Sequence, residues 1–218
     1  MIVYRLTDGD AHTVPIATRC RTCFLMTQLG GALPPELVTI RERVEAAFRG
    51  DGFDVVDANS FTTGRDFLHK IWEIIVAVPV GVALLHQDVA PKTLANIFYE
   101  IGVMQALGKE TLVVKAPGAN VPSDFVRTEY VTADDKLEQK LARYLTYLGE
   151  QEAHYGQMGA LVENNPLLAL DYTRRAYLLS GDEAWQEQAD QIVGASDLSE
   201  RAADSVEMIL ASFARRSE

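Results

Sequence analysis

One acidic side chain stands inside an otherwise apolar helical pattern near the middle of the chain. Residues 95–109 read Ala-Asn-Ile-Phe-Tyr-Glu-Ile-Gly-Val-Met-Gln-Ala-Leu-Gly-Lys, so Glu100 has mainly apolar neighbours. A carboxylate on such a face is poorly hydrated, and its pKa rises unless a hydrogen-bond donor compensates. The alternative is an ordinary surface glutamate, since Glu favours helices and usually faces water. We interpret Glu100 as the main candidate for chemistry on a bound ligand.

Two further residues of this segment could serve the same ligand. Asn96 precedes Glu100 by four residues, which places both side chains on one helical face, one turn apart. Gly102 follows Glu100 by two residues, and its missing side chain permits close approach of a backbone or a ligand. We therefore include Asn96 and Gly102 among the predicted substrate-binding residues.

Alternating strand and helix patterns surround this segment. Short apolar runs predict strands, and apolar residues at helical spacing predict the helices between them. Parallel neighbours need helical crossovers, so the alternation predicts an α/β fold with a doubly wound parallel sheet. The strands are expected at 22–26, 53–56, 80–85, 111–114 and 127–131, and the helices at 35–49, about 67–75 and 93–107.

The pattern changes after the predicted sheet. No strand-like run occurs from residue 134 onward, and apolar residues there recur at helical spacing. We expect an α/β domain over residues 18–133 and an all-helical C-terminal region over residues 134–218. The helical region is expected to pack either against the sheet domain or against another subunit.

Polar residues follow three of the predicted strands. Ligands of open α/β sheets bind in the crevice at the carboxyl ends of the strands, and location alone recommends these residues. Simple turn chemistry is the alternative for each of them. The candidates are Gln28 and Gly30 after the first strand, Asp57 and Ser60 after the second, and His86 and Asp88 after the third.

Charge and hydropathy limit the classes of partner. The formal net charge is −11, and residues 134–218 hold 16 acidic and 8 basic side chains. Such a balance disfavours a nucleic-acid polymer, whose binding depends on Lys and Arg, but not a single nucleotide. No signal peptide is evident, and the most apolar stretch, residues 71–85, is too short to span a bilayer and contains Glu73 and Pro79. We expect a cytoplasmic protein without membrane contact.

Cys20 and Cys23 form a single Cys-x-x-Cys pair. Zinc needs about four protein ligands in a structural site, and no second pair occurs, although His12 could add a third ligand. We interpret the pair as reduced cysteines at the entry to a strand and assign no metal.

The residues around Glu100 resemble a motif of the superfamily that joins nucleoside 2-deoxyribosyltransferases to TIR and TIR-like domains. The recurrent pattern there is an apolar strand, a polar loop, Asn-(Val/Ile)-Phe-Tyr-Glu-(Leu/Ile)-Gly, then Gly-Lys and another apolar strand. Here it stands as Asn96 to Gly102, Gly108-Lys109 and residues 111–114. The apolar run from Cys23 to Met26 is similar to the first strand of such proteins. The likeness covers about residues 20–131 and implies a flavodoxin-like sheet.

The resemblance also implies an activity at the N-glycosidic bond of a nucleotide. Glu100 would act on the anomeric carbon as nucleophile or on the ribose hydroxyls as an orienting base. NAD is the expected substrate, with no separate cofactor, because its nicotinamide leaves as a neutral group from a cationic nitrogen. NAD glycohydrolase activity in bacterial antiviral defence is the implied role, and deoxyribosyl transfer is the related one. The resemblance further implies a homo-oligomer, or a partner protein bound through the helical C-terminal region.

Two departures from the superfamily pattern favour a different function. Leu94 stands where deoxyribosyltransferases usually carry an Asp, and Asn96-Ile97 stands where TIR enzymes often have Trp-Cys. These differences favour a nucleotide-sensing and oligomerising module that binds its ligand without chemistry.

Overall fold

A computed structural model of the chain describes residues 18–30, 32–59, 67–122, 130–195, 200–211 and 213. The chain divides into two compact units. The sheet unit comprises Thr22–Arg65 and Val80–Thr146, and the helical unit comprises Met1–Arg21, Asp66–Pro79 and Tyr147–Glu218. Residues 134–146 group with the sheet in this division, and residues 67–79 group with the helices.

The sheet unit is built on five strands that are all parallel, and this confirms the predicted α/β class. The strands follow the order β2-β1-β3-β4-β5. The central strand β3 is buried along its whole length, as its continuous apolar sequence requires for a strand covered on both faces. The strands are β1 (Thr22–Met26), β2 (Asp54–Val56), β3 (Val80–Leu85), β4 (Glu110–Lys115) and β5 (Tyr130–Thr132).

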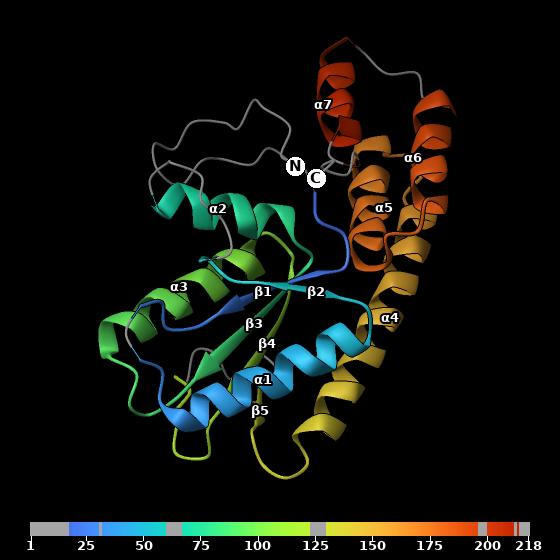
Figure 1. The fold of residues 1–218 in the computed structure, drawn as a ribbon. Coiled ribbons are helices and arrows are strands. Elements are labelled where there is room, and N and C mark those ends of the chain that lie inside the picture. Colours follow the sequence, from blue (N-terminus) through green and yellow to red (C-terminus); the bar gives the residue numbers. More distant parts are fainter. Residues whose placement is uncertain are drawn as a thin grey trace. The chain divides into compact units, whose positions relative to one another are not determined.

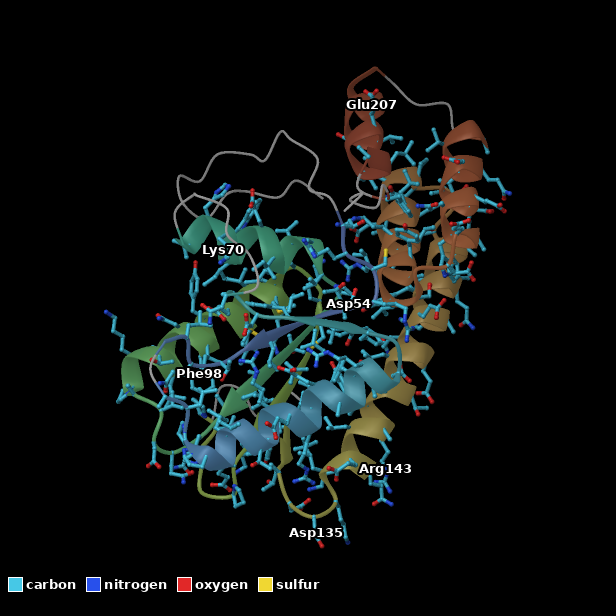
Figure 2. All side chains as sticks on the ribbon, viewed as in Figure 1. Asp54, Lys70, Phe98, Asp135, Arg143 and Glu207 are labelled. Atoms are coloured by element: carbon cyan, nitrogen blue, oxygen red, sulfur yellow. The ribbon has the colours of Figure 1, made fainter. Side chains whose placement is uncertain are left out.

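Helices α1 (Pro35–Gly50) and α3 (Pro91–Ala106) cover opposite faces of this sheet. Both begin at the end where β1 and β3 finish, as Figure 1 shows on its left side. Side chains fill the space between the strands and the two helices (Figure 2). Each helix has a proline in its first turn, where the fixed φ of proline suits the helix. Neither helix has a side-chain cap at its start. Helix α3 therefore starts at Pro91, two residues before the expected start at residue 93.

The start of helix α4 (Leu137–Leu161) packs beside α1 in the sheet unit. The centroid of the Phe48 ring lies 5.7 Å from that of Phe53, in an edge-on arrangement, and 6.5 Å from that of Tyr144 on α4. Arg43 of α1 also donates to both carboxylate oxygens of Glu138 on α4. These contacts close the α1 face of the sheet with a second helix.

The helical unit consists of α2 (Phe67–Ala77), the second part of α4, α5 (Pro166–Ser180), α6 (Ala184–Ala195) and α7 (Glu200–Ala211). Asn165 caps α5 by accepting from the Leu168 amide at 3.2 Å, and Gly181 ends it at φ 70°. None of the helices in the described ranges has both the length and the apolar character that a membrane span needs. A buried cluster joins α5 to α7 and comprises Leu170, Tyr177, Ala189, Val206 and Phe213.

Candidate functional site

Helix α3 turns Glu100 toward the sheet together with three apolar residues. Glu100 is only 8% exposed, and the other buried positions of the helix are Ile97, Ile101 and Met104. The side chain of Met104 packs over Gly81, near the start of β3. Since α3 begins at the carboxyl edge of the sheet and runs back along it, Glu100 lies one turn, about 6 Å, nearer to that edge than Met104. The carboxylate is therefore held on the α3 face of the central strand, toward its carboxyl end.

The surroundings of Glu100 do not compensate its charge. Among the described residues, none forms a hydrogen bond or an ion pair with its carboxylate. Burial raises the pKa of Glu100 from its ordinary value to about 7, because the charged form is desolvated. The ionised carboxylate would thus be stabilised strongly by a cation that enters beside it.

Asn96 and Gly102 lie on the same helix but in more open surroundings. The Asn96 side chain is exposed, one turn closer to the carboxyl edge than Glu100. A Cβ built at Gly102 would meet no heavy atom of the described residues within 4 Å. Of the three residues predicted on this helix, only Glu100 is therefore enclosed by the protein itself.

The segment after β1 holds two predicted residues and one that sequence reasoning missed. Gln28 donates through Nε2 to the carbonyl oxygen of Gly30 at 3.2 Å, and Gly30 has a left-handed φ of 79°. Thr27 is 5% exposed, and its hydroxyl has no hydrogen-bond partner in the described part of the chain. A buried hydroxyl without a partner costs free energy, so this group is available to a ligand. A threonine directly after a strand was the only signal in the sequence.

Asp57, after β2, is occupied by structural contacts. Its Oδ2 accepts from Arg41 of α1 at 2.8 Å, and its Oδ1 accepts from the amide of Asn59 at 2.9 Å. Arg41 also donates to Glu45 at 2.6 Å, which completes a network that anchors the end of β2 to α1. Ser60, which was also predicted here, lies outside the described residues.

His86, after β3, is buried and bonded on both ring nitrogens. Its Nδ1 accepts from the amide of Asp88 at 3.1 Å, and its Nε2 lies 3.1 Å from Oε2 of Glu36. The Asp88 carboxylate itself points outward and stays 3.7 Å from the ring. Glu36 stands in the first turn of α1, where an acidic residue was not singled out from the sequence. The partnership joins two residues that are 50 positions apart.

The two cysteines do not form a disulfide, and Cys23 is fully buried in β1. Burial raises the pKa of the Cys23 thiol, so this residue is a poor nucleophile. Within the described ranges, no three His, Cys, Asp or Glu side chains gather in a group that could hold a metal ion.

The site residues thus come from both sides of one edge of the sheet. Strands β1 and β3 are neighbours in the sheet, and the chain leaves them toward α1 on one face and α3 on the other. Such a point of reversal forms the ligand-binding crevice of open α/β sheets. Thr27, His86 and Glu36 belong to this edge on the α1 side, and Glu100 approaches it on the α3 side.

No protein-family model matches the chain, and no curated protein matches it significantly.

Proposed function

We propose that this protein cleaves or transfers the N-glycosidic bond of a nucleotide, with NAD as the substrate and Glu100 as the catalytic residue. One observation carries the proposal: Glu100 is buried, has no partner among the described residues and has a pKa raised to about 7. The strand order β2-β1-β3-β4-β5 is that of flavodoxin-like folds, and it supports the resemblance to the deoxyribosyltransferase and TIR-like superfamily.

The chemistry follows from the environment of the carboxylate. Cleavage breaks the bond between C1′ of the ribose and the pyridinium nitrogen, and the bonding electron pair neutralises the nitrogen of the departing nicotinamide. The positive charge that develops on the ribose is stabilised by the ionised Glu100, or is trapped when the carboxylate forms an ester with C1′. Water then adds to C1′ and releases one proton to solvent, and on the covalent route the bond between C1′ and the Glu100 oxygen breaks in the same step and restores the carboxylate. A free nucleobase whose ring nitrogen attacks C1′ in place of water, and releases its proton, would make the reaction a transfer.

The direct test is to incubate the purified chain with NAD and with nucleosides and to separate the products by chromatography. We expect free nicotinamide and an ADP-ribose product in equal amounts. Glu100→Gln should lose at least about a hundredfold in turnover, because the amide cannot carry the charge. Glu42→Gln changes an exposed glutamate of α1 and serves as the matched control. Full turnover by Glu100→Gln would refute the catalytic role.

A role in bacterial antiviral defence and assembly through the helical region are part of the same proposal. Leu161, at the end of α4, is 76% exposed, and Leu168 of α5 is also exposed, so the helical unit offers apolar side chains to a second copy or a partner protein. Light scattering with and without NAD tests this assembly. A monomer under both conditions would contradict it.

A nucleotide-sensing module is the second candidate function. It is favoured by Ile97, which is buried where TIR enzymes often carry Cys, and by Leu94 in place of an Asp. Under this alternative, calorimetry would detect NAD binding while chromatography recovers the nucleotide intact. Formation of product in proportion to NAD loss would exclude it.

A further inference from the structure

We propose that Glu36, His86 and Thr27 form a subsite that binds the ribose hydroxyls of the nucleotide. This inference rests on the proposed nucleotide substrate and adds to it a group of residues on the other face of the sheet from Glu100. Glu36 would accept hydrogen bonds from the sugar, His86 would hold Glu36 in position, and Thr27 would supply a hydroxyl to the same sugar.

The tautomer of His86 follows from its backbone contact. Because Nδ1 accepts from the Asp88 amide, the proton of the neutral ring lies on Nε2, which donates to Glu36 Oε2 at 3.1 Å. The amide of Gln87 lies 3.2 Å from the same nitrogen, and a half turn of this group presents its oxygen as a second acceptor. His86 is thus a fixed donor with its side chain 4% exposed.

Glu36 is the accessible end of this arrangement. Its side chain is 48% exposed, and only Oε2 is used by His86. The second oxygen, Oε1, forms no hydrogen bond with any described residue. A carboxylate that is oriented by a buried histidine and keeps one free oxygen is a suitable acceptor for a hydroxyl, since the entropic cost of orienting it is already met in the free protein.

Thr27 faces the α1 side of the sheet, as His86 and Glu36 do. The ε-methyl of Met26 approaches Gly81 on the α3 face, and side chains alternate along a strand, so Thr27 points toward the α1 face. The same alternation along β3 directs His86 to the α1 face. Thr27 follows β1 and His86 follows β3, which pair directly. A buried hydroxyl without a described partner therefore lies at the edge that carries the Glu36–His86 pair.

The chemistry of these groups selects the ligand class. A free carboxylate oxygen repels phosphate and attracts hydroxyl donors, and a threonine hydroxyl both donates and accepts. The ribose of a nucleotide presents such hydroxyls. Binding the sugar here would hold the nucleotide at the crevice between β1 and β3.

The test uses the Glu100→Gln protein, so that binding is measured without turnover. Calorimetry gives the Kd for NAD and for NAD analogues that each lack one ribose hydroxyl. At least one analogue should bind about tenfold more weakly than NAD, as expected for a hydrogen bond to a charged group. Adding Glu36→Gln should abolish this difference, and adding Glu42→Gln should preserve it. Adding Thr27→Val should weaken NAD binding while the Tm of the free protein stays equal or rises.

Each outcome decides between the proposals. We call the weaker binding of an analogue that lacks one ribose hydroxyl the deoxy penalty. The subsite is overturned if every analogue binds as NAD does, if the deoxy penalty persists in full with Glu36→Gln, or if NAD does not bind. If Thr27→Val lowers the Tm and leaves NAD binding unchanged, its hydroxyl is structural and Thr27 is removed from the subsite. Intact NAD after incubation with the unmutated chain would refute the glycosidase function and leave a measured deoxy penalty standing. Turnover of NAD without any deoxy penalty would refute the subsite alone.

Discussion

The thioether of Met104 occupies the space directly above Gly81, so that helix α3 rests on a glycine of the central strand. A Cβ at Gly81 would overlap Met104 Sδ and would lie 2.8 Å from Cε of Met26. Both methionines are almost fully buried, which leaves their ends little room to move aside. Because Glu100 stands one turn from Met104, this contact sets how deeply the carboxylate is held.

Gly81→Ala should therefore destabilise the sheet unit by about 1–3 kcal/mol, as expected when a methyl group is forced into a filled core. Hydrogen exchange of the β3 amides, followed by mass spectrometry, measures the change. Gly102→Ala is the control, because an added Cβ there meets no described atom within 4 Å. That replacement should stabilise α3 by about 0.5–1 kcal/mol. Faster exchange in Gly102→Ala than in Gly81→Ala would contradict the packing argument.

The raised pKa of Glu100 predicts how stability depends on pH. The folded protein binds the proton until about pH 7, whereas the unfolded chain releases it near 4.5. Between these values the native state holds more protons than the unfolded chain. The contribution of Glu100 to the free energy of unfolding is therefore complete below pH 4.5 and is lost as pH rises through about 7. The whole loss amounts to roughly 3 kcal/mol.

Glu100→Gln should remove this loss, because the amide is uncharged at every pH. We expect the variant to be more stable than the parent at about pH 8 and close to it at about pH 4. Urea unfolding at both pH values measures the difference. An equal stability difference at the two pH values would show that Glu100 has no raised pKa in the folded protein.

The same pKa predicts the pH profile of the proposed reaction. Only the ionised carboxylate can stabilise the cationic sugar, so kcat/KM for NAD should increase about tenfold per pH unit below 7 and level off above it. A bound pyridinium favours the charged form of Glu100, so the midpoint of the kcat profile should lie at lower pH. Initial rates across about pH 5–9 give both profiles. A kcat/KM that is constant across this range would contradict Glu100 as the ionising group.

Local patterns were sufficient to predict most of the elements of the fold. Strands β1 and β3 have the predicted bounds, because an apolar run between polar turn residues marks a buried strand directly. The end of α5 at Gly181 also follows from local chemistry, since glycine adopts the left-handed cap without strain. Helix α3 starts at Pro91 and not at residue 93 as expected, because proline suits the first position of a helix that has no side-chain cap.

The site was only partly predictable for a different reason. The burial of Glu100 can be read from its apolar neighbours on one helix, which is a local property. The role of Glu36 depends on its contact with His86, which forms only when α1 packs on the sheet beside the end of β3. Asp57 has the location of a site residue, but its charge is taken up by Arg41, a partner that spacing alone does not indicate.

A second close approach occurs in the helical unit, where Gly156 of α4 faces the indole ring of Trp185 on α6. A Cβ at Gly156 would overlap the ring, whose position is fixed by a hydrogen bond from Nε1 to Glu152 at 3.0 Å. Gly156→Ala should therefore separate the two helices and destabilise this unit by about 1–3 kcal/mol.

Gly149→Ala, on the same helix, is the matched control, because a Cβ there meets no described atom within 4 Å and alanine favours the helix by about 0.5–1 kcal/mol. Both tryptophans of the chain, Trp72 and Trp185, belong to the helical unit, so their fluorescence during urea unfolding reports on this unit. We expect the midpoint to fall for Gly156→Ala and to rise for Gly149→Ala. Equal midpoints for the two variants would mean that the indole does not rest on Gly156 in solution.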